Sequence, residues 1–149
     1  MILPDFKAFP HHGRLLGIDW GLRRIGVAVS DAEHDFVFAR PVVTVPRGAD
    51  NHARLIADIA KDEAVVGIVV GLPLYNDGSD SDTTKMVRGF IDALAEITDL
   101  PICTIEENLT SAAAQENMGR VKIQKLKENL DSESARVILE NAIAMINRT

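Results

Sequence analysis

The sequence predicts a single α/β domain: a mixed β-sheet with an antiparallel hairpin at one side and helices on both faces. Three observations predict it. Two apolar runs flank a glycine turn near the N-terminus, the segment from Val65 to Leu72 is apolar on both faces, and amphipathic segments alternate with strands after residue 50. With 149 residues, 46% of them hydrophobic, the chain can bury a core of its own.

The stretch 14–31 predicts the hairpin. Its first strand, around residues 15–18, is strongly apolar and ends on Asp19. A tight connection over 21–24 leads into the antiparallel partner, 25–29. A carboxylate beside such apolar neighbours is costly unless a cation or hydrogen bonds compensate it. Asp19 therefore needs an explanation, and a metal ion would supply one.

The later elements alternate between strand and helix. Residues 35–45 predict a third strand that turns or leaves the sheet at Pro41. The elements that follow are a helix capped by Asp50 or Asn51 and ending at Lys61, a central strand over 65–72, a loop over 73–82, a helix opened by Thr83 or Thr84, a strand over 101–105, a helix from Leu109 or Thr110, and a last helix over 131–146. The second of these helices is expected to bury Met86, Val87, Phe90, Ile91 and Leu94.

Composition limits the classes of function. The single cysteine, Cys103, excludes an intramolecular disulfide and, with only four histidines, argues against a zinc cluster of Cys and His ligands, so oxygen ligands are expected for any metal. The net charge of −6 counts against a broadly basic surface but leaves room for a local basic patch. The chain has neither a run of transmembrane length nor the pattern of a secretory signal, and we expect a cytoplasmic protein with residues 1–13 as an N-terminal extension.

Four acids stand out by position. Asp19 ends the first strand, Glu106 and Glu107 end the last, and Asp131 opens the final helix. Asp131 lies one turn before Ala135 on the stripe expected to face the sheet, so that helix would direct it toward the strand ends. Converging carboxylates repel one another unless divalent cations neutralise them, and hard oxygen ligands suit Mg²⁺ or Mn²⁺. The acids together predict a metal site.

Each acid also has a simpler explanation. Asp131 is equally consistent with a helix cap that complements the helix dipole. Asp19 could accept backbone amides in its own turn. Glu106 and Glu107 could be solvated charges at the end of a strand. The metal hypothesis therefore depends on all the acids meeting in space.

Several cations lie near these acids in the sequence. The residues expected to contact nucleic-acid phosphates are Arg23, Arg24, Arg120, Lys122, Lys125 and Lys127. For any one of them, a solvated helix or loop face is an equally good explanation. Trp20, beside Asp19, is the one aromatic residue near the site, and core packing is the role expected for it.

Four blocks of the chain resemble, in order, blocks of the YqgF/RuvX family of ribonuclease-H-like proteins, described as pre-16S rRNA nucleases or Holliday-junction resolvase homologues. The blocks are GIDWGLRRIGVAVSD (17–31), GLPLYNDGSDS (71–81), EENLTSAAA (106–114) and DSESARVILENAI (131–143). The resemblance implies a ribonuclease-H-like mixed sheet flanked by helices. It also implies acids at Asp19, in the EENLT segment and at Asp131 that bind divalent metal for phosphodiester hydrolysis.

The chain departs from the family pattern at a few positions. Glu106 stands where the family usually has Asp, and Asn108 replaces an arginine that could meet a phosphate or brace the acids. In the last block, Ser132 and Ser134 stand in place of alanines and Glu140 in place of glutamine. The candidate metal ligands remain.

The expected activity is a metal-dependent nuclease acting on the 5′ end of pre-16S ribosomal RNA. In a two-metal site, one ion activates water and the other stabilises the leaving oxygen. Asp19 is expected to bridge the ions, with Glu107 or Glu106 on one and Asp131 on the other. The alternatives are a junction-resolving DNA endonuclease, or a nucleic-acid- or ribosome-binding module with weak catalysis. A monomer would favour RNA processing, whereas a symmetric homodimer would favour junction cutting. Actin-like sugar kinases and ATPases close two related lobes around a nucleotide, and a chain of 149 residues supplies only one, which argues against that class.

Overall fold

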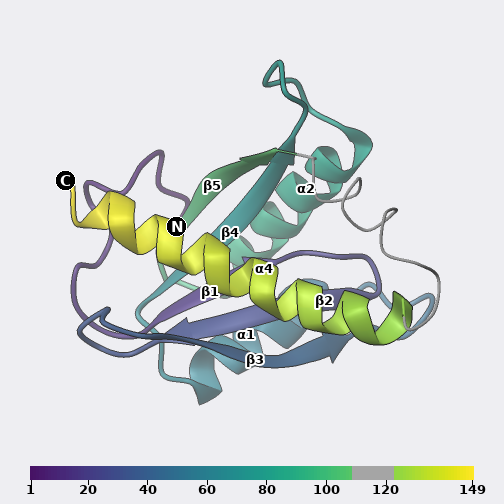
Figure 1. The fold of residues 1–149 in the computed structure, drawn as a ribbon, viewed down its shortest axis with the longest axis horizontal. Coiled ribbons are helices and arrows are strands. Elements are labelled where there is room, and N and C mark those ends of the chain that lie inside the picture. Colours follow the sequence, from purple (N-terminus) through teal and green to yellow (C-terminus); the bar gives the residue numbers. More distant parts are fainter. Residues whose placement is uncertain (109–122) are drawn as a thin grey trace.

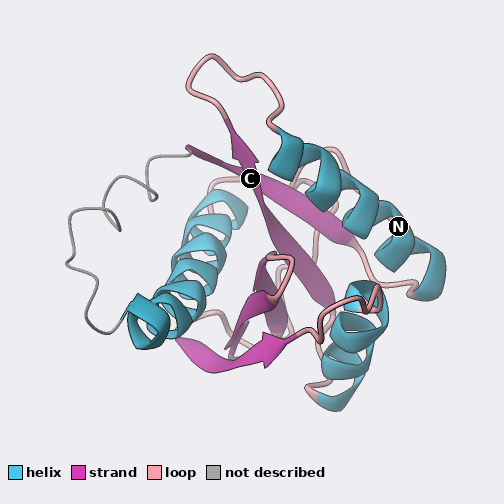
Figure 2. Ribbon diagram, turned by 90° about the vertical axis from the view of Figure 1, so that its right-hand side faces the viewer, coloured by secondary structure: helices cyan, strands magenta, loops and turns pink. Residues whose placement is uncertain are grey.

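The computed structural model contains a five-stranded mixed sheet with α4 on one face and α1 and α2 on the other (Figure 1, Figure 2). It describes the backbone of residues 1–108 and 123–149 and the side chains of residues 1–107 and 133–149. The strands are β1 (Leu15–Asp19), β2 (Arg24–Ser30), β3 (Val37–Thr44), β4 (Gly67–Leu74) and β5 (Ile102–Asn108), and the helices are α1 (His52–Asp62), α2 (Asp82–Ile97) and α4 (Ile123–Ile146). The predicted mixed α/β sheet is confirmed.

The order of strands in the sheet is β3-β2-β1-β4-β5. β1 is antiparallel to β2, as the hairpin prediction requires, and parallel to β4, which is in turn parallel to β5. The C-terminal ends of β1, β4 and β5 therefore meet at one end of the sheet, here called the carboxyl end. The sheet thus brings Asp19 and the last residues of β5 to the same end.

Alternation along the strands divides the core between the two faces. On β1, Leu16 and Ile18 pack in the cluster beneath α1 and α2, whereas Leu15 packs with Ala135 and Leu139 of α4. Residues 1–13 also join the α4 side: Phe6 and Phe9 are buried there, and Leu3 donates a backbone hydrogen bond to Ile102.

Helix α4 approaches the sheet closely because β1 presents a glycine to it. A Cβ atom on Gly17 would lie 2.8 Å from the Cβ of Leu139 and 3.0 Å from the carbonyl oxygen of Ala135, so a side chain would push the helix away. Among the helices that the structure describes, none has the length together with the apolar character that crossing a bilayer requires.

The third strand differs from the prediction. β3 continues through Pro41, and the register with β2 shifts between the pairs Val27–Arg40 and Ile25–Val43. A proline fits there because β3 is an edge strand and an irregularity in the pairing removes the need for its N–H. In place of the expected turn or exit from the sheet at Pro41, the structure has a change of register.

The starts of the two helices on the far face also differ from the prediction. Asn51 occupies the N-cap position of α1, but its side chain makes no capping hydrogen bond. Helix α2 begins at Asp82, and Ser81 forms a reciprocal capping box with Thr84. Met86 does not belong to the buried stripe of α2: it is 43% exposed.

Two boundaries near the candidate site were placed wrongly. β5 extends to Asn108, so Glu106 and Glu107 lie within the strand. α4 begins at Ile123, and the interpretation of Asp131 as the opening or cap of this helix is wrong. The segment IQKLKENL contains good helix formers with apolar residues at helical spacing, so the helix starts eight residues earlier. The helix expected from Leu109 or Thr110 falls outside the described residues.

Candidate functional site

Asp19 is the last residue of β1 and is partly buried. It pairs with Gly26 of β2 and follows Ile18, which pairs with Val70 of β4. Gly17, two residues earlier on the same strand, lies against α4. Because side chains alternate along a strand, Asp19 belongs to the face of the sheet that α4 covers.

Glu107 reaches the same face from β5. It pairs with Pro73, while Ile105 pairs with Gly71. Its carboxylate leans back over Gly71, since a Cβ atom on that glycine would lie 3.0 Å from Glu107 Oε2. The same Cβ would lie 2.5 Å from Ile138 Cδ1 of α4, so a side chain at this position would have to displace Ile138 or the carboxylate.

Asp19 and Glu107 thus lie on the two strands that flank β4, on one face, with Gly71 between them. Val70 pairs with Ile18, so the next residues on the two parallel strands, Gly71 and Asp19, are also at the same level. Adjacent strands lie about 4.8 Å apart, so the backbones of β1 and β5 are separated by roughly 10 Å. Side chains that lean inward over a glycine can approach from that separation closely enough to bind common ions.

Glu107 is the acid whose surroundings are most unusual for a carboxylate. Burial raises its pKa above the usual range of a glutamate. Within the described part of the chain no hydrogen bond or ion pair to its side chain is present that would offset this. A bound proton or a cation would relieve the cost of the buried charge.

Glu106 belongs to the opposite face, and its side chain is exposed. The nearby cation is Arg88 of α2, which binds Asp80 through two hydrogen bonds of 3.0 and 3.1 Å. The hydrogen bonds to Asp80 raise the pKa of Arg88, and the charge of Glu106 contributes a smaller effect in the same direction. The two glutamates that the sequence could not separate therefore face different environments.

The remaining predicted residues are described only in part. Asp131 lies in α4 one turn before Ala135, and its side chain is outside the described residues, as are those of Lys125 and Lys127. Arg120 and Lys122 lie outside the described residues altogether. Arg23 is exposed in the hairpin connection, and Arg24 is partly buried at the start of β2, both near the carboxyl end.

Gly71 and Arg88 were not singled out by reasoning from the sequence. A glycine inside the apolar run VVGIVVGL was a usable signal, because glycine in a strand often marks a close approach of another group. Arg88 carries no such signal: its position follows from the loop after β4, where Leu74 pairs with Asp80 and Thr84 Oγ1 donates to the carbonyl of Pro73.

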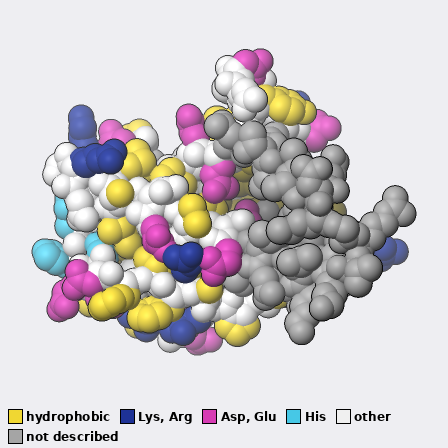
Figure 3. Space-filling model, in the orientation of Figure 1, with side chains coloured by type: hydrophobic (Ala, Val, Ile, Leu, Met, Phe, Trp, Pro, Cys, Tyr) yellow, Lys and Arg dark blue, Asp and Glu magenta, His cyan; other side chains and the backbone are white. Residues whose placement is uncertain are grey.

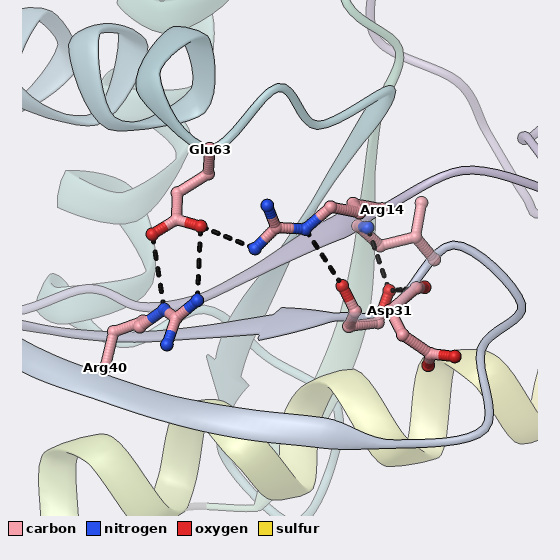
Figure 4. Close-up of polar contacts among 6 residues, drawn as sticks. Arg14, Asp31, Arg40 and Glu63 are labelled. Atoms are coloured by element: carbon pink, nitrogen blue, oxygen red, sulfur yellow. Dashed lines mark hydrogen bonds and ion pairs between the residues drawn. The ribbon is translucent and has the colours of Figure 1, made fainter.

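Another group of acids lies at the opposite end of the sheet. The turn between β2 and β3 brings carboxylate oxygens of Asp31, Glu33 and Asp35 within 4.8 Å of one another. This turn is next to Arg14, whose Nε donates to the carbonyl of Ser30 and whose guanidinium pairs with Glu63 at 2.5 Å (Figure 4). Asp31 accepts a 2.8 Å hydrogen bond from the Phe36 amide, which lowers the pKa of its carboxyl.

The face that carries α4 has a mixed character. Arg136 pairs with Glu133 and Glu140 on the exposed side of the helix. Figure 3 views this face and shows acidic and basic side chains interspersed with hydrophobic ones. The described surface of this face is therefore not a continuous basic patch.

Comparison with known proteins identifies the family. The model of the RuvX family, described as Holliday junction resolvase, matches residues 13–145. A protein of Maridesulfovibrio salexigens named "Putative pre-16S rRNA nuclease" is 38% identical over 133 residues, which cover 88% of this chain and 98% of that protein. A protein of the same name from Sphingopyxis alaskensis is 40% identical over 151 residues, covering 97% of this chain and 96% of the relative.

A solved structure supports the fold. Thermus thermophilus RuvC, solved in complex with a Holliday junction substrate, superposes with a TM-score of 0.54 at 17% identity, covering 87% of this chain and 93% of that one. At this level of identity the likeness concerns the fold alone, and it agrees with a ribonuclease-H-like sheet. The family match spans most of the chain, including β1, β4, β5 and all but the last residue of α4. The chain belongs to the RuvX family.

Proposed function

We propose that this protein is a metal-dependent nuclease that hydrolyses phosphodiester bonds in precursor 16S ribosomal RNA. The observation that carries the proposal is the half-buried carboxylate of Glu107, which leans over Gly71 toward the strand that ends in Asp19. Perturbed carboxylates that converge on one end of a sheet are typical of functional sites. The names of the relatives supply the class of substrate.

The residues present fit a divalent metal. Asp19 and Glu107 offer oxygen donors, the donor type that Mg²⁺ and Mn²⁺ prefer, and burial of Glu107 makes a cation favourable beside it. We assign Asp19 as the ligand shared between the ions, Glu107 as a ligand of one ion and Asp131 as a ligand of the other. When bound, such ions activate a water and neutralise charge on the phosphate oxygens.

The protein itself positions the ligands and the substrate. Gly71 leaves room for the Glu107 carboxylate, and Ile138 closes the space behind it. Arg23 and Arg24 at the carboxyl end would contact the phosphate backbone without reading its sequence. Lys125 and Lys127 would extend that contact along α4, as would Arg120 and Lys122 before it.

Junction DNA is the second candidate substrate. The description of the matching family model favours it. Cutting opposed strands of a junction needs two sites related by symmetry, so this activity predicts a homodimer, whereas RNA trimming is compatible with a monomer. A binding module with weak catalysis is the third reading, because Asn108 stands where the family has an arginine.

The test is a nuclease assay on precursor ribosomal RNA and on a four-way DNA junction, with Mn²⁺ and with a chelator. We expect cleavage of the RNA that requires Mn²⁺ and that falls by about 10³-fold in Asp19→Asn, because a lost metal ligand removes several kcal/mol of transition-state stabilisation. Glu33→Gln, in the acidic turn at the other end of the sheet, is the control and should cleave normally.

The outcomes separate the candidates. Cleavage of the junction but not the RNA would assign the protein to junction resolution. Tight binding of either substrate without cleavage would favour the binding module. Undiminished cleavage by Asp19→Asn would show that the site lies elsewhere.

A further inference from the structure

A cavity of about 420 Å³ opens between α1 and α2, on the face of the sheet opposite the carboxylates. Its walls include Trp20 directly after β1, His52 at the start of α1, and Met86, Gly89 and Phe90 from α2. This volume falls within the range of sites that bind small ligands. Two large apolar side chains in its lining are exposed to solvent: Leu22 is 55% exposed and Met86 is 43% exposed.

The lining offers flat aromatic surface. The Trp20 and His52 rings stack with their centroids 5.3 Å apart and an angle of 28° between their planes. His52 is buried, and its Nε2 is hydrogen-bonded to the carbonyl of Leu22 at 2.8 Å, which fixes the ring. Trp20 Nε1 is enclosed and has no hydrogen-bond partner among the described residues. Because Nε1 is shielded from solvent, the rest of the Trp20 ring lines the cavity and this donor does not.

The cavity is adjacent to the candidate metal site along the chain. Trp20 directly follows Asp19, so their Cα atoms are about 3.8 Å apart. The two side chains belong to opposite faces of the sheet, since Trp20 packs against the core beneath α1 and α2. A strand of nucleic acid crossing the carboxyl end could present a phosphate to one side and the neighbouring base to the other.

We propose that this cavity binds an unpaired nucleobase next to the scissile phosphate. A nucleobase is flat and stacks on aromatic side chains, which matches the aromatic and apolar walls of the cavity. The proposal rests on the proposed nuclease function and deepens it: the substrate would be a single strand, or a duplex with a base displaced from its stack. Asp50, exposed at the rim, adds an acceptor for the amino group of such a base.

The test uses the fact that Trp20 is the only tryptophan of the chain, so tryptophan fluorescence, excited selectively over that of Tyr75, reports on the cavity. Adenosine 5′-monophosphate and ribose 5-phosphate are titrated separately into the full-length protein in the presence of chelator. We expect saturable quenching by the nucleotide and none by the sugar phosphate. Because no metal is present, the result does not depend on cleavage.

A matched pair of variants at Gly89 connects the signal to the cavity. A Cβ atom on Gly89 meets no atom within 4 Å, so the fold accommodates a side chain there, and helix propensity improves. Gly89→Leu fills the cavity and should weaken nucleotide binding about tenfold or more, the loss expected when one stacked base is displaced. Gly89→Ala should bind as the unmodified protein does. Thermal melting of both variants checks the fold.

Three results would overturn the proposal. They are equal quenching by nucleotide and sugar phosphate, unchanged affinity in a folded Gly89→Leu variant, and saturable quenching by N-acetylphenylalaninamide but not by the nucleotide, which would indicate a protein partner. If any of these accompanies metal-dependent cleavage, the nuclease assignment stands and the base site fails. Nucleotide binding without cleavage would support the base site and contradict the nuclease.

Discussion

Glu107 and Glu63 are both partly buried carboxylates, near opposite ends of the same sheet, and their pKa values are displaced in opposite directions. Burial also opposes ionisation of Glu63, but hydrogen bonds from Arg40 and Arg14 outweigh it and lower the pKa of its carboxyl. Figure 4 shows Glu63 beside these two arginines. Its carboxylate lies 3.2 Å from Arg40 Nε and 2.5 Å from the guanidinium of Arg14. For Glu107, burial is the sole influence among the described residues, and it raises the pKa.

The opposite pKa shifts separate an acid that stabilises the fold through ion pairs from an acid whose buried charge a ligand would stabilise. Glu63 directly follows α1 and forms ion pairs with Arg40 of β3 and with Arg14, the residue before β1. Glu107 makes the sheet less stable when ionised, and a protein tolerates such a cost at sites where a ligand compensates it. The comparison predicts that removing each charge has opposite consequences for stability and for activity.

The largest expected effect is on catalysis. Glu107→Gln keeps the shape of the side chain but removes a charged metal ligand, and should slow Mn²⁺-dependent cleavage by about 10²-fold or more. Glu106→Gln changes the neighbouring glutamate on the other face and should reduce the cleavage rate far less. Glu63→Gln should cleave at the normal rate per folded molecule. Initial rates at saturating Mn²⁺ measure this. A greater loss in Glu106→Gln than in Glu107→Gln would reverse the assignment of the two glutamates.

A glycine substitution tests the space above β4. Gly71→Ala places a methyl group 3.0 Å from Glu107 Oε2 and 2.5 Å from Ile138, so it should displace the carboxylate and strain the packing of α4. We expect weaker Mn²⁺ binding by calorimetry and a loss of about 1–3 kcal/mol in the free energy of unfolding. Gly89→Ala, whose new methyl group meets open space, is the control and should be neutral or stabilising. Unchanged Mn²⁺ affinity in Gly71→Ala would remove Glu107 from the site.

Stability without metal should change in opposite directions in the two glutamate variants. Glu63→Gln removes the negative charge and one of the two acceptor oxygens that bind Arg14 and Arg40, and should lower the free energy of unfolding by about 1–2 kcal/mol at neutral pH. Glu107→Gln removes a charge that burial disfavours and should raise it. Urea unfolding in chelator measures both. The comparison fails if both variants are destabilised alike.

The pH dependence gives the smallest and most specific signal. Because the pKa of Glu63 is lowered, its contribution is complete above the ordinary glutamate pKa of about 4.3 and is lost as the pH falls through the lowered value. The deficit of Glu63→Gln should therefore shrink at acidic pH. Because the pKa of Glu107 is raised, the unmodified protein should gain stability relative to Glu107→Gln as the pH falls through that raised value. Unfolding curves across a pH series decide this.

Much of the site was predictable because its signals are local. The apolar run that ends on Asp19, the glycine turn and the antiparallel partner are written in adjacent residues, and the structure confirms the hairpin. The position of an acid at the end of a strand is likewise visible before any fold is known. These features predict that Asp19 and the acids at the end of β5 belong to one site.

The rest depends on packing and register, which adjacent residues do not encode. Which of Glu106 and Glu107 faces α4 depends on the strand phase, and the predicted strand stopped too early to define it. The start of α4 at Ile123 could not be separated from a basic loop, because good helix formers without a cap residue mark no boundary. The core packing predicted for Trp20 is confirmed, but the cavity beside that ring arises only when α1 and α2 pack together.

The most direct test of the shared metal site is a crystal of the protein soaked in Mn²⁺, with the ion located by its anomalous scattering. We predict Mn²⁺ at the carboxyl end of the sheet, bound by Asp19 and Glu107 above Gly71, with Asp131 completing the site. Mn²⁺ bound instead at the turn formed by Asp31, Glu33 and Asp35, with none between Asp19 and Glu107, would contradict this account.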